Sequence, residues 1–312
     1  MPLIGTRKFP KGPDLKRSEQ HSISVSGTRI AFSAPAHRHD AIQATPPLSG
    51  SFNLYDASHF GRFNKKDQVE PASFTLELKD WRFNGIPLLD GTGVIGDMKF
   101  KVSIVSMPEF ASLFHPRHLE CAVERYIYTA YTAYRIPGEC RQNWRVIKIN
   151  GKEWVNYESM GYPGYRNAEE CYESVWHTPI TDQHLLTVRF DQVIRKKRTR
   201  LAEVYQKIIE QVMNSFEIQL SLDAQAQQEL IRTTHPEEQL SEILPPYEFE
   251  EYEVDNEYDL IDEIGAQHNF ELPHEEVKRL WEIEKKRQRQ MQKETRVRVI
   301  ESHLRFKLME KE

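Results

Sequence analysis

The stretch NWRVIKINGKEWVNYE, residues 143–158, decides the fold, because it carries the clearest strand signals in the chain. Two apolar runs flank the dipeptide Asn150-Gly151, which supplies the positive φ angles that a two-residue hairpin turn requires. Farther along, the apolar residues of LLTVRF, 185–190, alternate with polar ones, as in a strand with one buried face. The sequence therefore predicts an antiparallel sheet built around this hairpin.

Further elements are predicted on both sides of the hairpin. SISVSGTRIAF, 22–32, indicates a first hairpin, and alternation at 74–78 and 100–104 indicates two half-buried strands. Apolar residues at three- and four-residue steps predict helices over 117–134 and 195–220. The expected fold class is α+β, an antiparallel sheet packed by helices and followed by an acidic linker and a charged C-terminal helix.

Composition divides the chain into four parts. Residues 1–20 are rich in Pro, Gly, Lys and Arg without a period, which favours a mobile N-terminal arm, and 21–222 form the α+β globular domain. Residues 223–273 are read as an acidic linker, because twelve acidic residues fall between 237 and 263. Residues 274–312 are helical by propensity and heavily charged.

Global composition points to an ordinary intracellular protein. The net charge is −5 and 39% of the residues are hydrophobic, so the whole chain lacks the basic footprint of a nucleic-acid binder. No apolar run is long enough to cross a bilayer and the N-terminus has no secretory signal, which predicts a cytoplasmic protein without membrane contact. Three cysteines, Cys121, Cys140 and Cys171, show no disulfide or metal spacing, as expected in a reducing compartment.

Motifs of catalysis are incomplete. GTGVIG, 91–96, matches a dinucleotide-binding glycine pattern, but the strand-like DMKFKVSIV follows where a helix is needed, so a glycine-rich β-turn is the better interpretation. No G-x-S-x-G or H-E-x-x-H occurs in the chain. We therefore expect no cofactor, and the sequence favours a non-catalytic protein over an enzyme without deciding between them.

Histidine clusters are the weak candidates for a metal site. HRHD contains His37 and His39, and HPRHLEC contains His115, His118 and Cys121. His118 and Cys121 would share a helix face and could chelate a divalent ion with a further ligand. No second short-spaced pair completes such a site, and surface or capping histidines explain the residues as well.

The segment WHTPITDQHLLTVRF offers the best candidate for specific binding within the domain. Trp176 and His177 precede an extended Thr-Pro step and a turn at Thr181-Asp182, and an exposed pair there would suit a partner. The competing interpretation makes Trp176 a core residue, since tryptophans are mostly buried. Aromatic residues of the C-terminal part are further candidate partner contacts: Tyr247, Phe249, Tyr252, Tyr258 and Trp281.

Basic residues gather at 195–200, which we place in the first turn of the long helix, and again within 274–312. Such runs could hold phosphates. The acidic residues between 237 and 263 compete for the same cations, so intramolecular docking is the simpler expectation and nucleic-acid binding is not expected.

The order of elements, a hairpin, strands, a helix, then antiparallel strands around Asn150-Gly151 and a long helix, resembles the PsbP-like α/β fold. The pattern IKINGKEWVNYE … TPITDQHLLTVRF, within 21–222, is also similar to accessory domains of that shape beside bacterial secretion systems. No active-site motif of that family maps onto this chain, so no residue role follows from it. The resemblance implies a bacterial secretion-linked immunity or accessory protein.

The functional expectation is a non-catalytic soluble module that binds another protein, with the acidic segment and the terminal helix as a docking arm. It rests on the missing catalytic constellation and the polarised charge of the C-terminal part. The alternative is a metal-assisted enzyme or small-ligand binder, whose pocket would form where the loop 35–71 meets the sheet.

Overall fold

The computed structural model describes residues 5–36, 51–56, 60, 64–65, 68–69, 72–86, 93–131, 141–160, 170–196 and 199–244. The chain divides into two compact units, Met1–Ala130 with Gln142–Leu244 and Tyr131–Arg141 with Pro245–Glu312, and every described element except the end of α1 lies in the first. Among the described residues no helix is long and apolar enough to cross a membrane.

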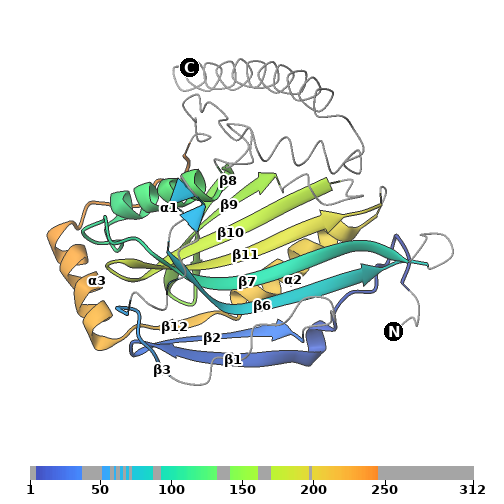
Figure 1. Cartoon of the computed structure of the whole chain (residues 1–312), viewed down its shortest axis with the longest axis horizontal. Helices are drawn as coiled ribbons and strands as arrows, with labels where there is room; N and C mark the ends of the chain where they lie inside the picture. The colour runs from blue at the N-terminus through green and yellow to red at the C-terminus, as the bar shows by residue number, and fades with distance from the viewer. Residues whose placement is uncertain are drawn as a thin grey trace, which may run out of the picture. The chain divides into compact units, whose positions relative to one another are not determined.

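Strands outnumber helices, which makes the described part of the chain an α+β structure (Figure 1). The strands are β1 (Ser18–Val25), β2 (Thr28–Pro35), β3 (Ser51–Phe52), β4 (Asn64–Lys65), β5 (Gln68–Val69), β6 (Ser73–Asn84), β7 (Val94–Ser106), β8 (Gln142–Ile149), β9 (Lys152–Met160), β10 (Glu170–Thr181), β11 (His184–Ile194) and β12 (Glu217–Gln219). The helices are the 3-10 turn η1 (Leu15–Arg17), α1 (Pro116–Tyr131), α2 (Leu201–Asn214) and α3 (Leu222–Thr234).

The larger sheet has six strands in the order β6-β7-β11-β10-β9-β8, and each neighbouring pair is antiparallel. The predicted hairpin is confirmed: β8 and β9 meet at Asn150 and Gly151, whose φ angles are 46° and 80°. Positive φ at both positions is the signature of the tight turn that the dipeptide predicts. The Asn150 side chain also donates to the backbone oxygens of Asn214 and Phe216, at 3.2 and 2.8 Å, which ties the turn to the end of α2.

The smaller sheet, of order β12-β2-β1-β3, joins parts of the chain far apart in sequence. The first predicted hairpin, β1–β2, is confirmed, and β12 extends it antiparallel on the β2 side. Helix α2 contacts both β2 and β11, so it packs with both sheets. The Phe32 ring of β2 stacks on Phe216 at 4.8 Å and meets Phe100 of β7 at 5.7 Å, which places the core between the two sheets.

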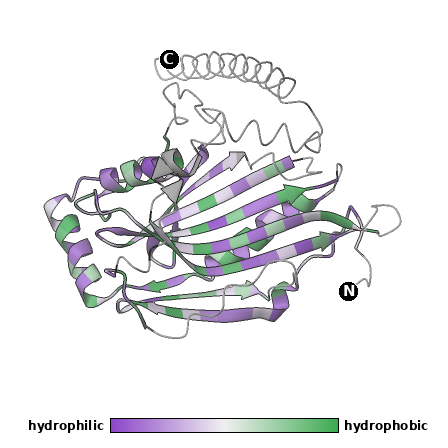
Figure 2. Ribbon diagram, viewed as in Figure 1, coloured by the Kyte–Doolittle hydropathy of each residue, from purple (hydrophilic) through white to green (hydrophobic). Residues whose placement is uncertain are grey.

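Hydropathy alternates along the strands of the larger sheet, as Figure 2 shows. Met98, Phe100 and Val102 of β7 belong to the core cluster shared with α2 and the smaller sheet. On the opposite face of this sheet, helix α1 supplies its own buried stripe, and Tyr126 of α1 meets His177 of β10 at 4.9 Å between ring centroids. The two faces therefore have separate apolar layers.

Three expected boundaries are wrong. Helix α2 begins at Leu201, so the basic residues from 195 precede it, because the Arg195 amide continues the β-ladder by donating to Ile95 O at 2.9 Å. The chain at 217–219 is β12 and not helix, since its backbone pairs with β2. Residues 222–234 form α3, capped by the Ser221 hydroxyl, and do not belong to a linker.

Candidate functional site

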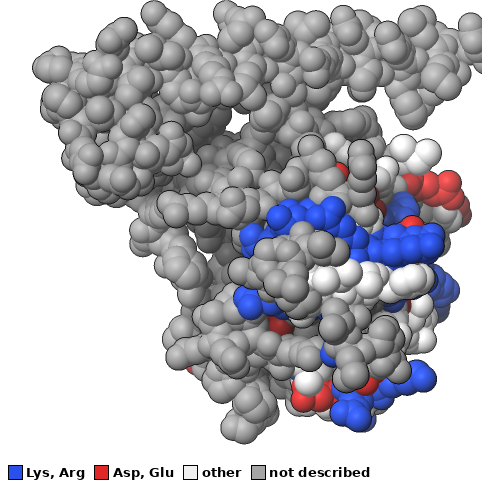
Figure 3. Space-filling model, turned by 90° about the vertical axis from the view of Figure 1, so that its right-hand side faces the viewer, with Lys and Arg blue, Asp and Glu red and all other residues white. Residues whose placement is uncertain are grey.

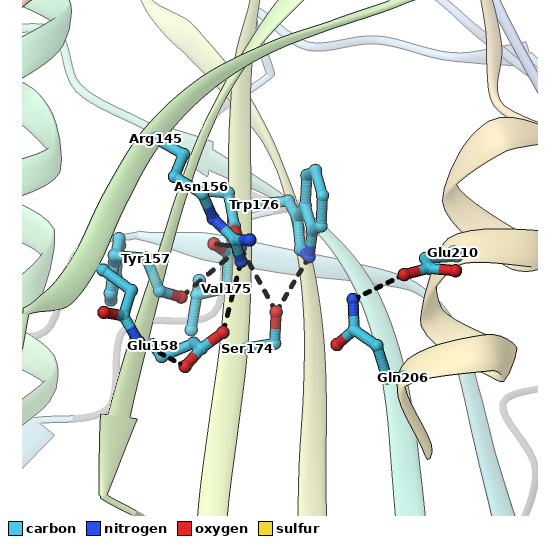
Figure 4. A network of polar contacts seen from close by, with 10 residues as sticks. Arg145, Asn156, Tyr157, Glu158, Ser174, Val175, Trp176, Gln206 and Glu210 are labelled. Atoms are coloured by element: carbon cyan, nitrogen blue, oxygen red, sulfur yellow. Dashed lines mark hydrogen bonds and ion pairs between the residues drawn. The ribbon is translucent and has the colours of Figure 1, made fainter. Parts of the chain in front are cut away.

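Trp176 lies in the core and is only 6% exposed, which excludes it as a direct partner contact in the folded domain. Its indole N–H donates to the Ser174 hydroxyl at 3.0 Å, and the Asn156 amide donates to the same oxygen at 3.2 Å (Figure 4). The Asn156 carbonyl in turn accepts from the guanidinium of Arg145 at 2.7 Å, and Arg145 also pairs with Glu158. This network crosses β8, β9 and β10 and holds the tryptophan in place.

His177 is fully buried on the α1 side of the sheet. Its ring nitrogens lie 3.0 Å from the Thr187 hydroxyl and 3.4 Å from the Tyr157 hydroxyl. Burial lowers its pKa from 6.5 to about 3, so the imidazole is neutral at neutral pH. The structure thus makes His177 a structural residue and contradicts its assignment to partner binding.

The histidines before and within the start of α1 do come together. The rings of His115 and His118 lie 4.6 Å apart, and His235, which follows α3, meets His115 at 4.7 Å. Burial, and then the neighbouring His118 and His235, lower the pKa of His115. Cys121 is exposed as a whole residue, but its thiol is partly shielded from water. This shielding, together with the nearby carboxylates, raises the pKa of the thiol, which keeps it protonated.

This histidine cluster does not assemble a metal centre in the described part of the chain, where no three His, Cys, Asp or Glu side chains are arranged to hold an ion. His118 Nδ1 is occupied at 3.0 Å from the backbone oxygen of Ser112. His115 Nδ1 accepts from the Arg117 amide at 3.2 Å and so caps the beginning of α1. The three rings, called here the histidine rim, lie in contact through His115, and His115 alone caps the helix.

Next to this rim lies a groove of about 350 Å³, called here the α3 groove. Its walls come from the beginning of α1, the β8–β9 turn, the last residues of β10 and the α3 face with the residues after it. The lining residues are Phe114, Pro116, Leu119, Lys148, Gly151, Lys152, Glu153, Thr178, Pro179, Gln228, Glu229, Ile231, Arg232, His235, Pro236, Glu238 and Leu240. Apolar and charged groups are therefore mixed within a space large enough for several side chains of a ligand.

Lys152 is the unusual group of the α3 groove. It is half-buried, and this burial lowers its pKa. Its ammonium lies 3.5 Å from the Gln228 side chain, and within the described ranges no carboxylate comes within ion-pair distance of it. By contrast, the groove carboxylates Glu229 and Glu238 are engaged by Arg232 and Arg117, at 3.0 and 3.5 Å.

The chain after α3 closes one side of the groove by lying on α1 and β8. The Trp144 indole donates to the Ser241 backbone oxygen at 2.8 Å, and the Ser241 amide donates to Glu120 at 2.5 Å. Arg117 donates to the Ser241 hydroxyl at 2.8 Å. These contacts fix the segment 235–244, although sequence patterns assigned it to a linker.

Several sequence candidates lie outside the described residues: His37, His39, Tyr247, Phe249, Tyr252, Tyr258 and Trp281. Most of the loop 35–71 also lies outside them, and the lining of the α3 groove includes none of its residues. Sequence reasoning missed Lys152 and His235. No sequence motif marks a lysine beside a hairpin turn as functional, and only the fold shows that α3 covers it.

Comparison with known proteins gives little more. No known protein-family profile matches the chain, and no curated protein resembles it. A crystal structure from Bacteroides thetaiotaomicron VPI-5482 matches 61% of this chain and 45% of its own at 10% sequence identity, with a TM-score of 0.23. A match at that TM-score carries no argument about fold or function.

Proposed function

We propose that the protein is a non-catalytic interaction module that binds an extended, acidic segment of another protein in the α3 groove. The observation that carries the proposal is the half-buried Lys152 ammonium, which faces Gln228 and no carboxylate of the described chain. A partner carboxylate there would replace lost hydration with a charge-assisted contact, and such contacts are about twice as strong as neutral ones. The Lys152 charge would then make the groove prefer acidic segments over neutral or basic ones.

The surroundings of the groove suit a polypeptide. Leu230 of α3 and Ile243 of the following segment are 61% and 69% exposed. Neither residue lines the groove, but both are close in sequence to residues that do, and exposed apolar side chains are typical of surfaces that bind proteins. The groove carboxylates Glu229 and Glu238 are already paired with arginines, so they oppose an acidic partner less than unpaired carboxylates would.

The C-terminal part of the chain is proposed to extend this contact. The acidic segment and the helix expected over 274–312 would act as a docking arm, and the PsbP-like resemblance supports a secretion-linked immunity or accessory role. Deleting 274–312 should abolish capture of the partner and leave the thermal unfolding of the domain unchanged. Unchanged capture by the deletion variant would rule out the arm.

The groove is tested by placing a photo-crosslinking amino acid at Gln228 on its wall, in the full chain expressed in its own host. The matched control places the same amino acid at Glu210, an exposed position on α2 outside the groove. We expect a protein crosslinked at Gln228 and absent from the Glu210 sample. Crosslinks only to residues 245–312 of the same chain, or to a small molecule, would overturn the proposal.

The crosslinked protein is then purified and its affinity measured against groove variants. Lys152→Gln should weaken binding by about tenfold or more, as expected for a lost charge-assisted contact of about 1.5–3 kcal/mol. Lys207→Gln removes an equal charge from the exposed face of α2 and serves as the control, with no expected change. Equal affinities of the two variants would contradict the assigned role of Lys152.

A further inference from the structure

Two basic runs that are distant in sequence meet at one end of the domain. The first, RKFPKGPDLKR at 7–17, and the second, RKKRTRLAE at 195–203, each hold five basic residues and one acidic residue, in a chain whose net charge is −5. The Arg200 amide donates to the Arg7 backbone oxygen at 3.1 Å, so the runs are in direct contact. Figure 3 shows lysine and arginine side chains gathered on this face. This surface is called here the basic end.

Most described carboxylates at the basic end are paired with arginines; the exception is Glu170, opposite Ile194 in the β10–β11 ladder, which accepts from the Tyr172 hydroxyl at 2.9 Å. Asp97 pairs with Arg195 at 2.6 Å and with Arg82 at 3.6 Å, so two guanidinium groups share one carboxylate. The single acidic residue of each run also has a partner within that run, through Arg17–Asp14 at 3.7 Å and Arg200–Glu203 at 3.4 Å. Among the described residues of this end there are nine cations, Arg7, Lys8, Lys11, Lys16, Arg17, Arg82, Arg195, Lys196 and Arg200, and four carboxylates, Asp14, Asp97, Glu170 and Glu203, a positive excess that the global charge hides.

The N-terminus of α2 adds to this field. Its preceding residue, Arg200, makes no side-chain capping bond, and the helix begins directly after this last basic residue of the second run. Unsatisfied amides at a helix start carry partial positive charge, which strengthens attraction for an anion. Basic side chains here cost stability, so their presence calls for a compensating negative partner.

Exposed aromatic rings accompany the charges. Phe9 is 60% exposed within the first run, with the Lys8 ammonium 5.7 Å from its ring centroid. Tyr172 is 40% exposed. It lies opposite Gln192 in the β10–β11 ladder, and Gln192 precedes Arg195 by three residues. Aromatic rings beside cations are the features with which proteins hold unpaired bases and the phosphates between them.

We propose that the basic end binds single-stranded nucleic acid without sequence preference, with lysines and arginines along the phosphates and Phe9 stacked on a base. The expectation against nucleic acid rested on sequence, where the two runs are nearly two hundred residues apart and the second is expected inside a helix. The fold joins them outside the helix. An acidic peptide has no bases to stack, and an anionic bilayer needs more exposed apolar side chains than these two aromatics. The inference is independent of the α3 groove.

The test is fluorescence anisotropy of the full chain with labelled oligo(dT) and oligo(U) of about 20 nucleotides, starting at about 50 mM salt. We expect binding to both, with the logarithm of the affinity falling linearly as the logarithm of salt rises. The triple variant Lys8→Glu, Lys196→Glu, Arg200→Glu should bind at least about thirtyfold more weakly, with a salt slope about 2 smaller. No binding by the unmodified chain at low salt would overturn the proposal.

Two matched variants separate the contributions. Phe9→Ala should lose about fivefold or more in affinity with an unchanged salt slope, because it removes stacking and not charge. Arg29→Glu, Arg125→Glu reverses two exposed charges away from the basic end and should bind as the unmodified chain does. Equal loss in this control, or displacement of the oligonucleotide by polyglutamate of the same charge at equal concentration, would reject nucleic acid as the ligand.

Discussion

Acidification should unfold the domain through two buried histidines. His177 and His184 have pKa values lowered by burial to about 3 and about 4, whereas a histidine in the unfolded chain titrates near 6.5. Between these values the unfolded chain binds protons that the folded chain does not, so the free energy of unfolding falls as the pH falls below about 6.5. At about pH 5 each histidine contributes a loss of about 2 kcal/mol relative to pH 7, or about 4 kcal/mol together, a large share of ordinary domain stability.

Urea unfolding at about pH 7 and about pH 5 measures this loss, and His177→Gln isolates one half of it. Glutamine keeps a polar group near the Thr187 and Tyr157 hydroxyls but does not titrate. The variant should be less stable at neutral pH, and its further loss on acidification should be smaller by about 2 kcal/mol. His235→Gln alters an exposed ring and should keep the full pH dependence. An identical pH dependence in His177→Gln and the unmodified chain would refute the reasoning.

Two further predictions concern particular contacts. Gly96→Ala should lower the free energy of unfolding by about 3 kcal/mol or more, or prevent folding, because the added Cβ would overlap the Tyr205 hydroxyl. Gly151→Ala should lower it by only about 1 kcal/mol, because the added Cβ meets no atom within 4 Å and only the positive φ is unfavourable. Similar melting temperatures of the two variants would contradict this. Folding lowers the pKa of Lys152, so below about pH 10.5 the unfolded chain binds more protons than the folded chain, and the free energy of unfolding rises with pH. Lys152→Gln should remove this part of the rise. The same change in unfolding free energy from about pH 8 to 10 in the variant and the unmodified chain, measured with urea, would argue against it.

Alternating strands and the hairpin turn were predictable because both depend on near neighbours. The Asn150-Gly151 turn needs only local backbone angles, and the period of two at 185–190 correctly indicates a strand; the single buried face expected from it is wrong, because both faces of β11 are buried. The end of α2 was not predictable in the same way. The apolar spacing continues to Leu220, but β2 offers backbone partners that capture 217–219 as β12.

The candidate site was harder still. His115 and His118 are neighbours in sequence and were found, but His235 joins them only through the path of α3. The segment 235–244 is polar and acidic, which is typical of a linker, yet the Trp144 indole and Glu120 hold its backbone. Lys152 and the basic end depend on the same long-range contacts, which no local period encodes.

The strand order of the smaller sheet has a consequence for synthesis on the ribosome. The β1–β2 hairpin emerges first, but its β2 edge is covered only by β12, which ends at Gln219. During translation at about 5–20 residues per second, that edge stays open for about ten seconds or longer. Nascent chains on one polysome could pair through it, as unprotected strand edges do. We therefore expect aggregation during synthesis to start at the β2 edge, and to be reduced once β12 is made.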